Sequence, residues 1–227
     1  MIRVAIISST MGSVMSSLLP IPYFSQRIAC LVTDRECGAL EVASQYGIPS
    51  SVIATKDSLE FSKALADKFE NEDIDLFVSF YKRLFRDPFL EQARGRLINM
   101  HPSILPACPG RDGFGDTVRS GSRFIGATVH YVDRELDTGC PIIQSACPYN
   151  PHKSMHENRH NVFVHQCKML LQVLDWCEQD RLHYDAEGRS HLKNGIYEVG
   201  EFAPALEHPE AIALHIPFVQ EKVAAFS

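Results

Sequence analysis

Short β-strand-like runs alternate with helical stretches through the first hundred residues of this 227-residue chain, and this alternation most constrains the fold. Helices are expected at 38–46, which Gly47 ends, and at 57–70, where apolar residues recur near helical spacing. Strands separated by such helices indicate βαβ units. We therefore predict an α/β fold, a Rossmann-like, doubly wound, mostly parallel sheet with flanking helices. The strand-like runs lie at 3–7, 28–33, 51–54, 74–80 and 97–100.

The alternation of strands and helices stops after Met100. A loop rich in Pro and Gly leads to strand-like runs at 126–132 and 141–146, and 155–178 has the pattern of one long helix. The segment 191–199 predicts a β-hairpin that turns on its Asn-Gly dipeptide.

No repeat, low-complexity run or linker composition interrupts the sequence. A chain of this length buries a sizeable core as a single domain. We therefore expect a principal domain over 1–182 and a C-terminal extension over 183–227, which contains the hairpin and packs on the same domain.

Composition excludes several function classes. A formal net charge of −6 gives no electrostatic basis for binding nucleic acid or an anionic membrane. No apolar run reaches the roughly 18 residues of a transmembrane helix, and the N-terminus opens on a strand-like run without a leader, so we expect a cytoplasmic protein. The seven cysteines are odd in number and form no C-x-x-C pair, which favours free thiols over disulfides or a zinc knot.

A Ser- and Thr-rich turn at 8–13 separates the first predicted strand from the first helix. Gly12 and Ser13 stand where backbone N–H groups at a helix N-terminus can bind a phosphate. The turn lacks the glycines of G-x-G-x-x-G and the Lys of a P-loop, so an ordinary N-capped turn is the alternative.

A second motif, His156 to His160, spells H-E-x-x-H, in which two histidines on one helix face can bind zinc while the Glu acts as base. The segment lacks the Gly and third His of the extended metalloprotease motif. We interpret it as a solvated or groove-lining helix face and expect no metal. A zinc hydrolase built on His156, Glu157 and His160 is the alternative.

Three side chains around the last of the parallel strands suit acyl transfer. Asn99 and His101 are two residues apart at the end of a strand, so their side chains point the same way. An amide donates to a developing oxyanion, an imidazole relays a proton, and a carboxylate such as Asp137 holds a charged imidazolium. The residue types alone leave a purely structural polar network as the alternative.

The segment that starts at Asn99 reads N-x-H-P-S-x-L-P, and G-A-T-V-H-Y-V at 126–132 and then L-D-T-G follow it. With similarity over 1–182, this combination resembles the folate-dependent formyltransferases, closest to the phosphoribosylglycinamide (glycinamide ribonucleotide) formyltransferases of purine biosynthesis. The resemblance implies the formyltransferase fold, 10-formyltetrahydrofolate as formyl donor and a primary amine as acceptor. It implies that Asn99 holds the formyl oxygen, that His101 is the general acid and base, and that Asp137 keeps His101 charged and oriented.

The resemblance also implies a folate cleft after the strand at 74–80. In the family this cleft is formed by a basic residue near the folate, by the segment after that strand, and by a loop that cradles the pterin. The corresponding residues of this chain are Lys56, Tyr81, Lys82, Arg83, Leu84 and Asp133.

The acceptor side departs from the family pattern, which has G-S-N in the first loop and a Glu-His pair in the late helix. This chain has Gly12, Ser13 and Val14 in the loop, and Gln166 followed by Cys167 in the helix. Gln166 still forms hydrogen bonds. We therefore expect an altered acceptor site that takes glycinamide ribonucleotide or another amine, such as an amino sugar.

Two further alternatives stay open. Water in place of the amine would give a formyltetrahydrofolate deformylase, but those enzymes carry an extra N-terminal regulatory domain, whereas this chain opens on the first strand. A catalytically silent ligand-binding relative is the other alternative. As partners we expect a small-molecule amine and folate, with no nucleic acid and no membrane, in a monomer or homodimer.

Overall fold

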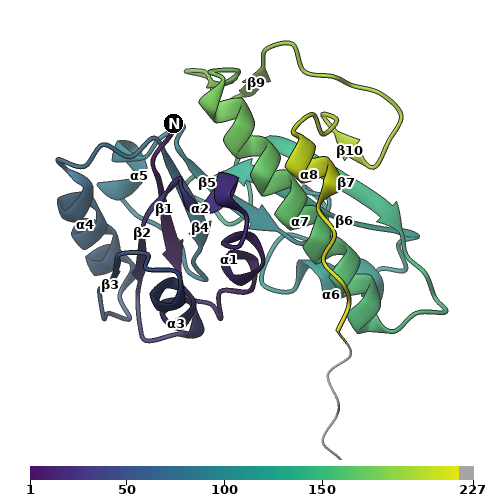
Figure 1. Ribbon diagram of the computed structural model, residues 1–227, viewed down its shortest axis with the longest axis horizontal. Coiled ribbons are helices and arrows are strands. Elements are labelled where there is room, and N and C mark those ends of the chain that lie inside the picture. Colours follow the sequence, from purple (N-terminus) through teal and green to yellow (C-terminus); the bar gives the residue numbers. More distant parts are fainter. Residues whose placement is uncertain (220–227) are drawn as a thin grey trace, which may run out of the picture.

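The computed structural model describes residues 1–219. Eight strands form the main sheet in the order β10-β7-β6-β5-β4-β1-β2-β3 (Figure 1). Five strands pair in parallel, and the last three pair antiparallel to their neighbours. The parallel strands are β1 (Val4–Ser8), β2 (Ile28–Thr33), β3 (Ser50–Val52), β4 (Leu76–Phe80) and β5 (Leu97–His101), and the antiparallel ones are β6 (Phe124–Tyr131), β7 (Pro141–Pro148) and β10 (Phe202–Ala203).

The winding of the sheet reverses at β1. The chain adds β2 and β3 on one side of β1, and then returns to add β4 and β5 on the other side. This order confirms the predicted doubly wound, mostly parallel sheet. The reversal opens a crevice beyond the carboxyl ends of β1 and β4, where sheets of this kind bind their ligands.

Both faces of the sheet are covered, because side chains alternate along each strand. On β1, Val4 and Ile6 enter one hydrophobic cluster and Ala5 and Ile7 enter the other, and all four are fully buried. A strand that is apolar on both faces is typical of a parallel sheet between two helix layers.

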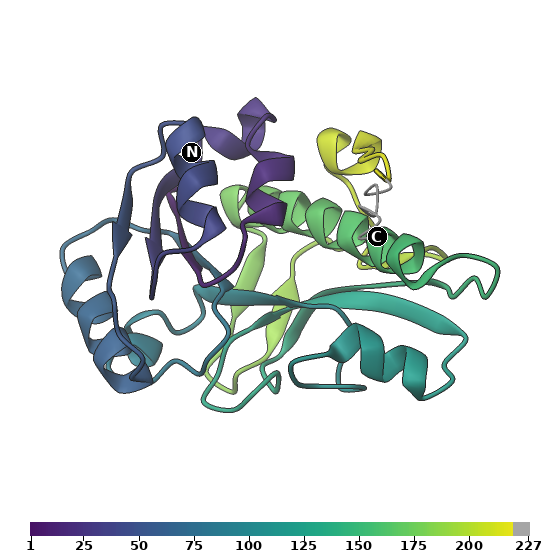
Figure 2. The ribbon, with the colours of Figure 1, turned by 90° about the horizontal axis from the view of Figure 1, so that it is seen from below.

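Helices α1, α3, α7 and α8 lie on one side of the sheet, and α4 and α5 lie on the other (Figure 2). The bounds of the helices are α1 (Ser13–Leu18), α2 (Pro22–Ser25), α3 (Gly38–Gln45), α4 (Ser58–Phe69), α5 (Phe89–Gln92), α6 (Gly113–Arg119), α7 (Met155–Glu178) and α8 (Pro209–Ala213).

Helix α7 has the predicted bounds, and a capping box explains where it begins. The Ser154 hydroxyl accepts from the Glu157 N–H, and the Glu157 carboxylate accepts from the Ser154 N–H at 2.8 Å. This exchange satisfies two N–H groups that a helix start otherwise leaves without partners. The last three turns pack into the core, with Trp176 fully buried.

The expected loop after β5 contains a helix, α6, that the Gly-rich sequence did not predict. Glycine at Gly113 and Gly115 disfavours a helix by about 1 kcal/mol each. The Asp112 carboxylate nevertheless caps the helix by accepting from the Gly115 N–H. Gly113 is buried against His101, so tertiary packing selects the helix.

The hairpin lies earlier than predicted. Strands β8 (Leu182–Tyr184) and β9 (Ser190–Leu192) pair antiparallel, whereas 191–199 does not form a hairpin on its Asn-Gly dipeptide. The Asp185 carboxylate fixes the observed turn, because it accepts from the Arg189 N–H at 2.8 Å.

The C-terminal residues that the structure describes lie against the main sheet and α7. Strand β10 pairs with β7, and Ala211 of α8 is fully buried. The Gln172 side chain of α7 accepts from the backbone N–H groups of Glu207 and His208. A boundary near residue 182 stays a prediction, and 220–227 lie outside the described residues.

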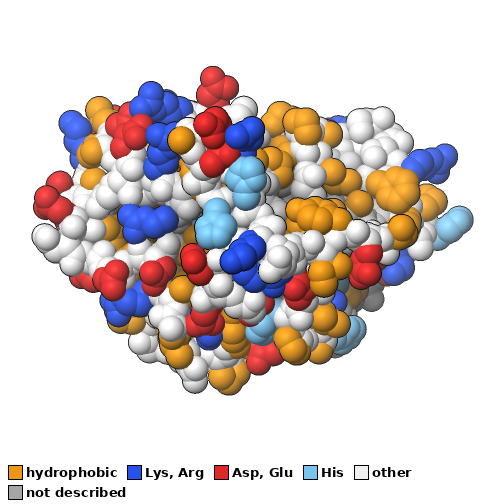
Figure 3. Space-filling model, turned by 90° about the horizontal axis from the view of Figure 1, so that it is seen from above, with side chains coloured by type: hydrophobic (Ala, Val, Ile, Leu, Met, Phe, Trp, Pro, Cys, Tyr) orange, Lys and Arg blue, Asp and Glu red, His pale blue; other side chains and the backbone are white. Residues whose placement is uncertain are grey.

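Charges of both signs are intermixed on the face shown in Figure 3, and hydrophobic side chains gather on one half of it. Within residues 1–219, no helix is both long enough and apolar enough to cross a membrane. The seven cysteines are free thiols.

Candidate active site

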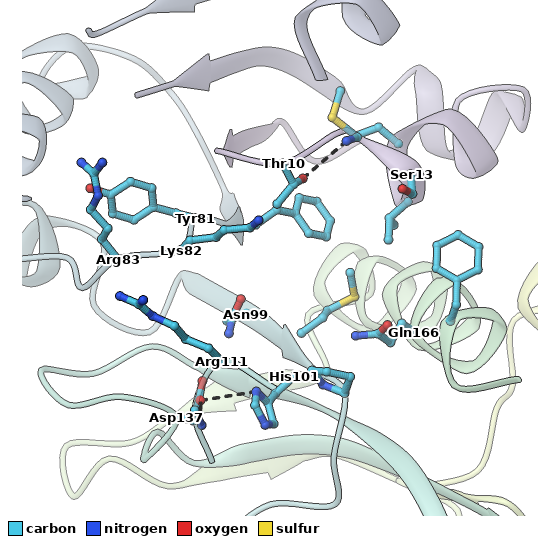
Figure 4. A pocket seen from close by; sticks show the side chains of 18 of the residues that line it. Thr10, Ser13, Tyr81, Lys82, Arg83, Asn99, His101, Arg111, Asp137 and Gln166 are labelled. Carbon is cyan, nitrogen blue, oxygen red and sulfur yellow. Dashed lines mark hydrogen bonds and ion pairs between the residues drawn. The ribbon is translucent and has the colours of Figure 1, made fainter. Parts of the chain in front are cut away.

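A cavity of about 740 Å³ opens at the carboxyl ends of β1, β4 and β5, where the winding reverses (Figure 4). Its walls are the loop from β1 to α1, the turn after β4, the end of β5, the loops after β5 and β6, and one face of α7. A cavity therefore lies at the position that the topology of the sheet predicts.

Asn99 and His101 line this cavity from β5, and Asp137 approaches His101 from the loop after β6 (Figure 4). The His101 ring is buried, with Nδ1 at 3.3 Å from Asp137 Oδ2 and Nε2 at 2.8 Å from the Cys108 carbonyl oxygen. One ring nitrogen therefore faces a carboxylate and the other a carbonyl. The ring can donate to both only in its doubly protonated form.

The loop that carries Asp137 is tightly constrained. Asp137 has a positive φ of 56°, and its Oδ2 accepts from the Gly110 N–H at 2.8 Å. Two residues on, a Cβ at Gly139 would lie 1.8 Å from the Tyr131 carbonyl oxygen, so only glycine lets the chain return to β7 there. The L-D-T-G segment thus fixes the carboxylate beside His101.

His130 completes the cluster, although the family resemblance placed it only at the start of the 130–137 loop expected to cradle the pterin. Its Nδ1 lies 2.7 Å from the Tyr131 carbonyl oxygen, and its Nε2 lies 3.4 Å from Asn99 Nδ2 and 3.7 Å from Asp137 Oδ1. Burial lowers the pKa of His130, although the Tyr131 carbonyl and Asp137 oppose this. A neutral ring that donates from Nδ1 presents an Nε2 lone pair to the Asn99 amide, and thereby orients that amide.

The sequence contained a signal for this role. Asn99 and His130 are directly paired in the antiparallel register of β5 and β6. Side chains on one face of directly paired residues are neighbours. The alternating helix–strand pattern of the first half predicted parallel strands and gave no such register, so the pairing was missed.

The predicted donor side is only partly assembled around the cavity. Tyr81, Lys82 and Arg83 line it, whereas Lys56, Leu84 and Asp133 do not. Lys56 is exposed after β3. Asp133 shapes the neighbouring loop instead, because its Oδ1 accepts from the Thr138 hydroxyl at 2.7 Å.

Two of the three donor-side residues are already engaged by the protein. The Tyr81 ring stacks on Phe61 at 4.7 Å between centroids and is nearly buried. Arg83 Nη1 lies 3.4 Å from the buried Asp34 carboxylate and donates to the Thr55 carbonyl. Lys82 is the exposed cation of the three.

The predicted acceptor-side residues Gly12, Ser13, Val14 and Gln166 all line the cavity. Gly12 has a φ of 79°, and a Cβ there would lie 2.9 Å from the Ala39 backbone, so the turn needs glycine. Cys167 lies outside the cavity lining in the core, and burial raises its pKa to about 12. A thiol of that pKa carries no nucleophilic chemistry near neutral pH.

The H-E-x-x-H motif serves the helix start and the C-terminal segment. The Glu157 carboxylate belongs to the capping box, and His160 Nε2 lies 2.7 Å from the Ile216 carbonyl oxygen. Within the described residues, no three His, Cys, Asp or Glu side chains are grouped as metal ligands.

A Rossmann-like sheet that brings an amide, an imidazole and a carboxylate together at its switch point defines an α/β enzyme suited to acyl transfer. A sequence model of the family described as Formyl transferase matches residues 2–174. The chain therefore belongs to the formyl transferase family. It is an enzyme that transfers a one-carbon formyl group.

Curated and solved relatives agree with this assignment. The phosphoribosylglycinamide formyltransferase of Bacillus subtilis is 34% identical over 155 residues, which cover 63% of this chain and 80% of that protein. Its namesake from Mycobacterium tuberculosis is 32% identical over 164 residues, 68% of this chain and 76% of that protein. Glycinamide ribonucleotide transformylase 1 of Symbiobacterium toebii superposes with a TM-score of 0.77 and 26% identity over 86% of this chain and 95% of its own. The resemblance read from the sequence is confirmed.

A formyltetrahydrofolate deformylase of Pseudomonas syringae pv. tomato superposes with a TM-score of 0.70 over 86% of this chain and 67% of that chain. Its identity is 19%, so the two proteins share the fold. That likeness carries no argument for hydrolysis in this chain.

Proposed function

We propose that this formyltransferase delivers the formyl group to a primary amine in the cavity at the end of β5, with glycinamide ribonucleotide as the first acceptor to test. The observation that carries the proposal is the cluster of Asn99, His101 and Asp137, which lines the cavity at the switch point. The names of the relatives supply the acceptor.

The reaction balances without a protein nucleophile. The amine nitrogen attacks the formyl carbon, a tetrahedral intermediate forms, and the bond from that carbon to N10 of the folate breaks. The amine loses one proton and N10 gains one. An amine is itself nucleophilic, so the protein has to stabilise the oxyanion and move the proton.

Asn99 and His101 divide these tasks. The Asn99 amide has two N–H groups, and since one faces His130 Nε2, the other is available to the formyl oxygen. His101 donates a proton toward N10, and the Asp137 carboxylate stabilises its charged form. This role requires the hydrogen bond from His101 Nε2 to the Cys108 carbonyl to open when substrate binds.

We assign the donor to the side of the cavity formed by 80–83. There Lys82 offers an exposed cation and the segment after β4 offers backbone groups to an anionic folate. We assign the acceptor to the opposite side, between Gly12, Ser13, Val14 and Gln166. An amino sugar or another biosynthetic amine is the alternative acceptor. We propose no donor contact for Lys56, Leu84 and Asp133, because they lie outside the lining.

The test follows folate release by absorbance while a panel of amines is offered, glycinamide ribonucleotide included. The Asn99→Ala variant is expected to lose about 100- to 1,000-fold in kcat, the typical effect of removing one oxyanion donor. Asn161→Ala, on α7 and outside the cavity lining, is the matched control and keeps wild-type kcat. The proposal fails if no amine accelerates folate release, or if Asn99→Ala matches the wild type.

We propose in addition that the enzyme works in the cytoplasm as a monomer or homodimer. Seven free thiols suit a reducing compartment. Light scattering of the purified chain and fractionation of cells that express it test the two statements. A larger assembly, or recovery outside the cytoplasm, would contradict them.

A further inference from the structure

One face of α7 forms the wall of the acceptor side. Arg159, Phe163 and Gln166 are spaced i, i+4 and i+7 along the helix, so they lie in one row, and all three line the cavity. Ser13 and Val14, at the start of α1, line the same cavity. A cation therefore stands on the side of the cavity that the folate does not occupy in the proposed arrangement.

Arg159 carries a charge that the protein does not neutralise. Its Nη1 donates to Gln166 Oε1 at 3.3 Å, and its guanidinium carbon lies 5.8 Å from the centroid of the Phe114 ring. Neither neighbour is anionic, and across residues 1–219 Arg159 forms no ion pair. Arg119, a nearby arginine outside the cavity lining, is by contrast paired with both Asp112 and Asp116.

The surroundings of Arg159 oppose its charge. Burial lowers its pKa, and the carboxylate that acts against this, Asp112, is exposed and engaged by Arg119 at 2.7 Å. A half-buried guanidinium without a carboxylate is costly unless a ligand completes it. Its planar fork of N–H groups suits a bidentate oxyanion.

We propose that Arg159 binds an oxyanion of the amine acceptor, a phosphate or a carboxylate, and that it selects for acceptors that carry one. Gln166 accepts from the guanidinium, which also lies over the Phe114 ring. The inference rests on the proposed function for the identity of the reaction. The anion site itself has a test that does not depend on turnover.

Binding is measured first, with inorganic phosphate and ¹³C-labelled acetate as probes and NMR line broadening as the signal. The full chain is expected to broaden the resonance of one probe, and Arg159→Gln is expected to lose that broadening. Arg159→Lys keeps the charge without the fork and is expected to recover part of it. Lys153→Gln removes one cation before α7, outside the cavity, and leaves the broadening unchanged.

Kinetics then connects the site to the acceptor. With an acceptor that carries the recognised oxyanion, Arg159→Gln is expected to raise KM about 10- to 100-fold, the range of a charge-assisted hydrogen bond. The KM for the folate donor stays within about threefold, and so does kcat. An acceptor that lacks the oxyanion has the same KM in both proteins.

If Arg159→Gln loses phosphate binding, the acceptor carries a phosphate. If it loses acetate binding, the acceptor carries a carboxylate. If neither probe depends on Arg159 while amines are formylated normally, the inference is overturned and the proposed function stands. If no amine is formylated but one probe depends on Arg159, the proposed function fails and the anion site stands.

Discussion

The substitution Gly113→Ala tests how closely the position of His101 controls the reaction. A Cβ at Gly113 would lie 2.3 Å from His101 Nε2 and 2.8 Å from its Cε1. Since ordinary contacts begin near 3.4 Å, the ring has to move by roughly 1 Å, because packed interiors have few voids to absorb the overlap. The methyl group also blocks the path from Nε2 to the Cys108 carbonyl, which now accepts at 2.8 Å.

A displacement of about 1 Å of a catalytic group costs about 100-fold in rate. We therefore expect kcat for formyl transfer to fall about 100-fold in Gly113→Ala. Burst and single-turnover measurements show whether the loss lies in the chemical step. Alanine is the better helix former by about 1 kcal/mol, so the variant is not expected to unfold.

The control is Gly115→Ala, in the same short helix. Its Cβ meets the Asp112 carboxylate at 2.2 Å rather than His101, so it weakens the helix cap and leaves the imidazole in place. It is expected to lose about 1 kcal/mol of stability with kcat within about threefold of wild type. Equal kcat in Gly113→Ala and the wild type, or an equal loss in both variants, would show that the position of the His101 ring does not control the rate.

Asp137→Asn keeps the shape and tolerates the positive φ, but removes the charge beside His101, so single-turnover rates are expected to fall about 100-fold or more. Leu171→Ala, at a fully buried position of α7, is expected to lower the free energy of unfolding by about 2–5 kcal/mol in urea titrations. Burial lowers the pKa of His130 and of His165, so the unfolded chain binds more protons than the folded one below about pH 6.5, the usual histidine pKa. Stability is therefore expected to fall as pH drops through that value, by up to about 1.4 kcal/mol per pH unit for each, and urea titrations from pH 7.5 to 5 of His165→Asn should show a shallower decline.

Much of the fold was predictable because its signals are local. Strand β2 and helix α7 have the predicted bounds, since a β-branched run defines one and a capping box with helical periodicity defines the other. Gly47 ends α3 with a φ of 66°, as a C-terminal glycine does.

The wrong predictions concern segments whose structure is determined by tertiary contacts. Helix α6 forms in a Gly-rich segment because Gly113 packs on His101 and Asp112 caps the first turn. Asn194 does adopt the positive φ of a turn, at 55°, yet no strand follows it closely enough to pair, and the hairpin instead turns at Asp185. A turn dipeptide specifies local backbone and not which strands meet.

The candidate site, like the fold, was predicted from the sequence only in part. The two-residue spacing placed Asn99 and His101 together, but no spacing placed Asp137 beside His101, because Asp137 lies in a loop, which has no periodicity. Arg159 was missed although its seven-residue spacing from Gln166 puts both on one helix face. That spacing was the available signal.

In the proposed reaction, this cavity passes a formyl group from folate to an amine through Asn99, His101 and Asp137. The most direct measurement uses 10-formyltetrahydrofolate labelled in the formyl carbon and follows the label into product. The label is expected in a formylated amine only when the amine is present, and at a rate reduced about 100-fold or more in His101→Ala. Release of the label as formate at the same rate with and without amine would contradict the proposed reaction, because water would then be the acceptor.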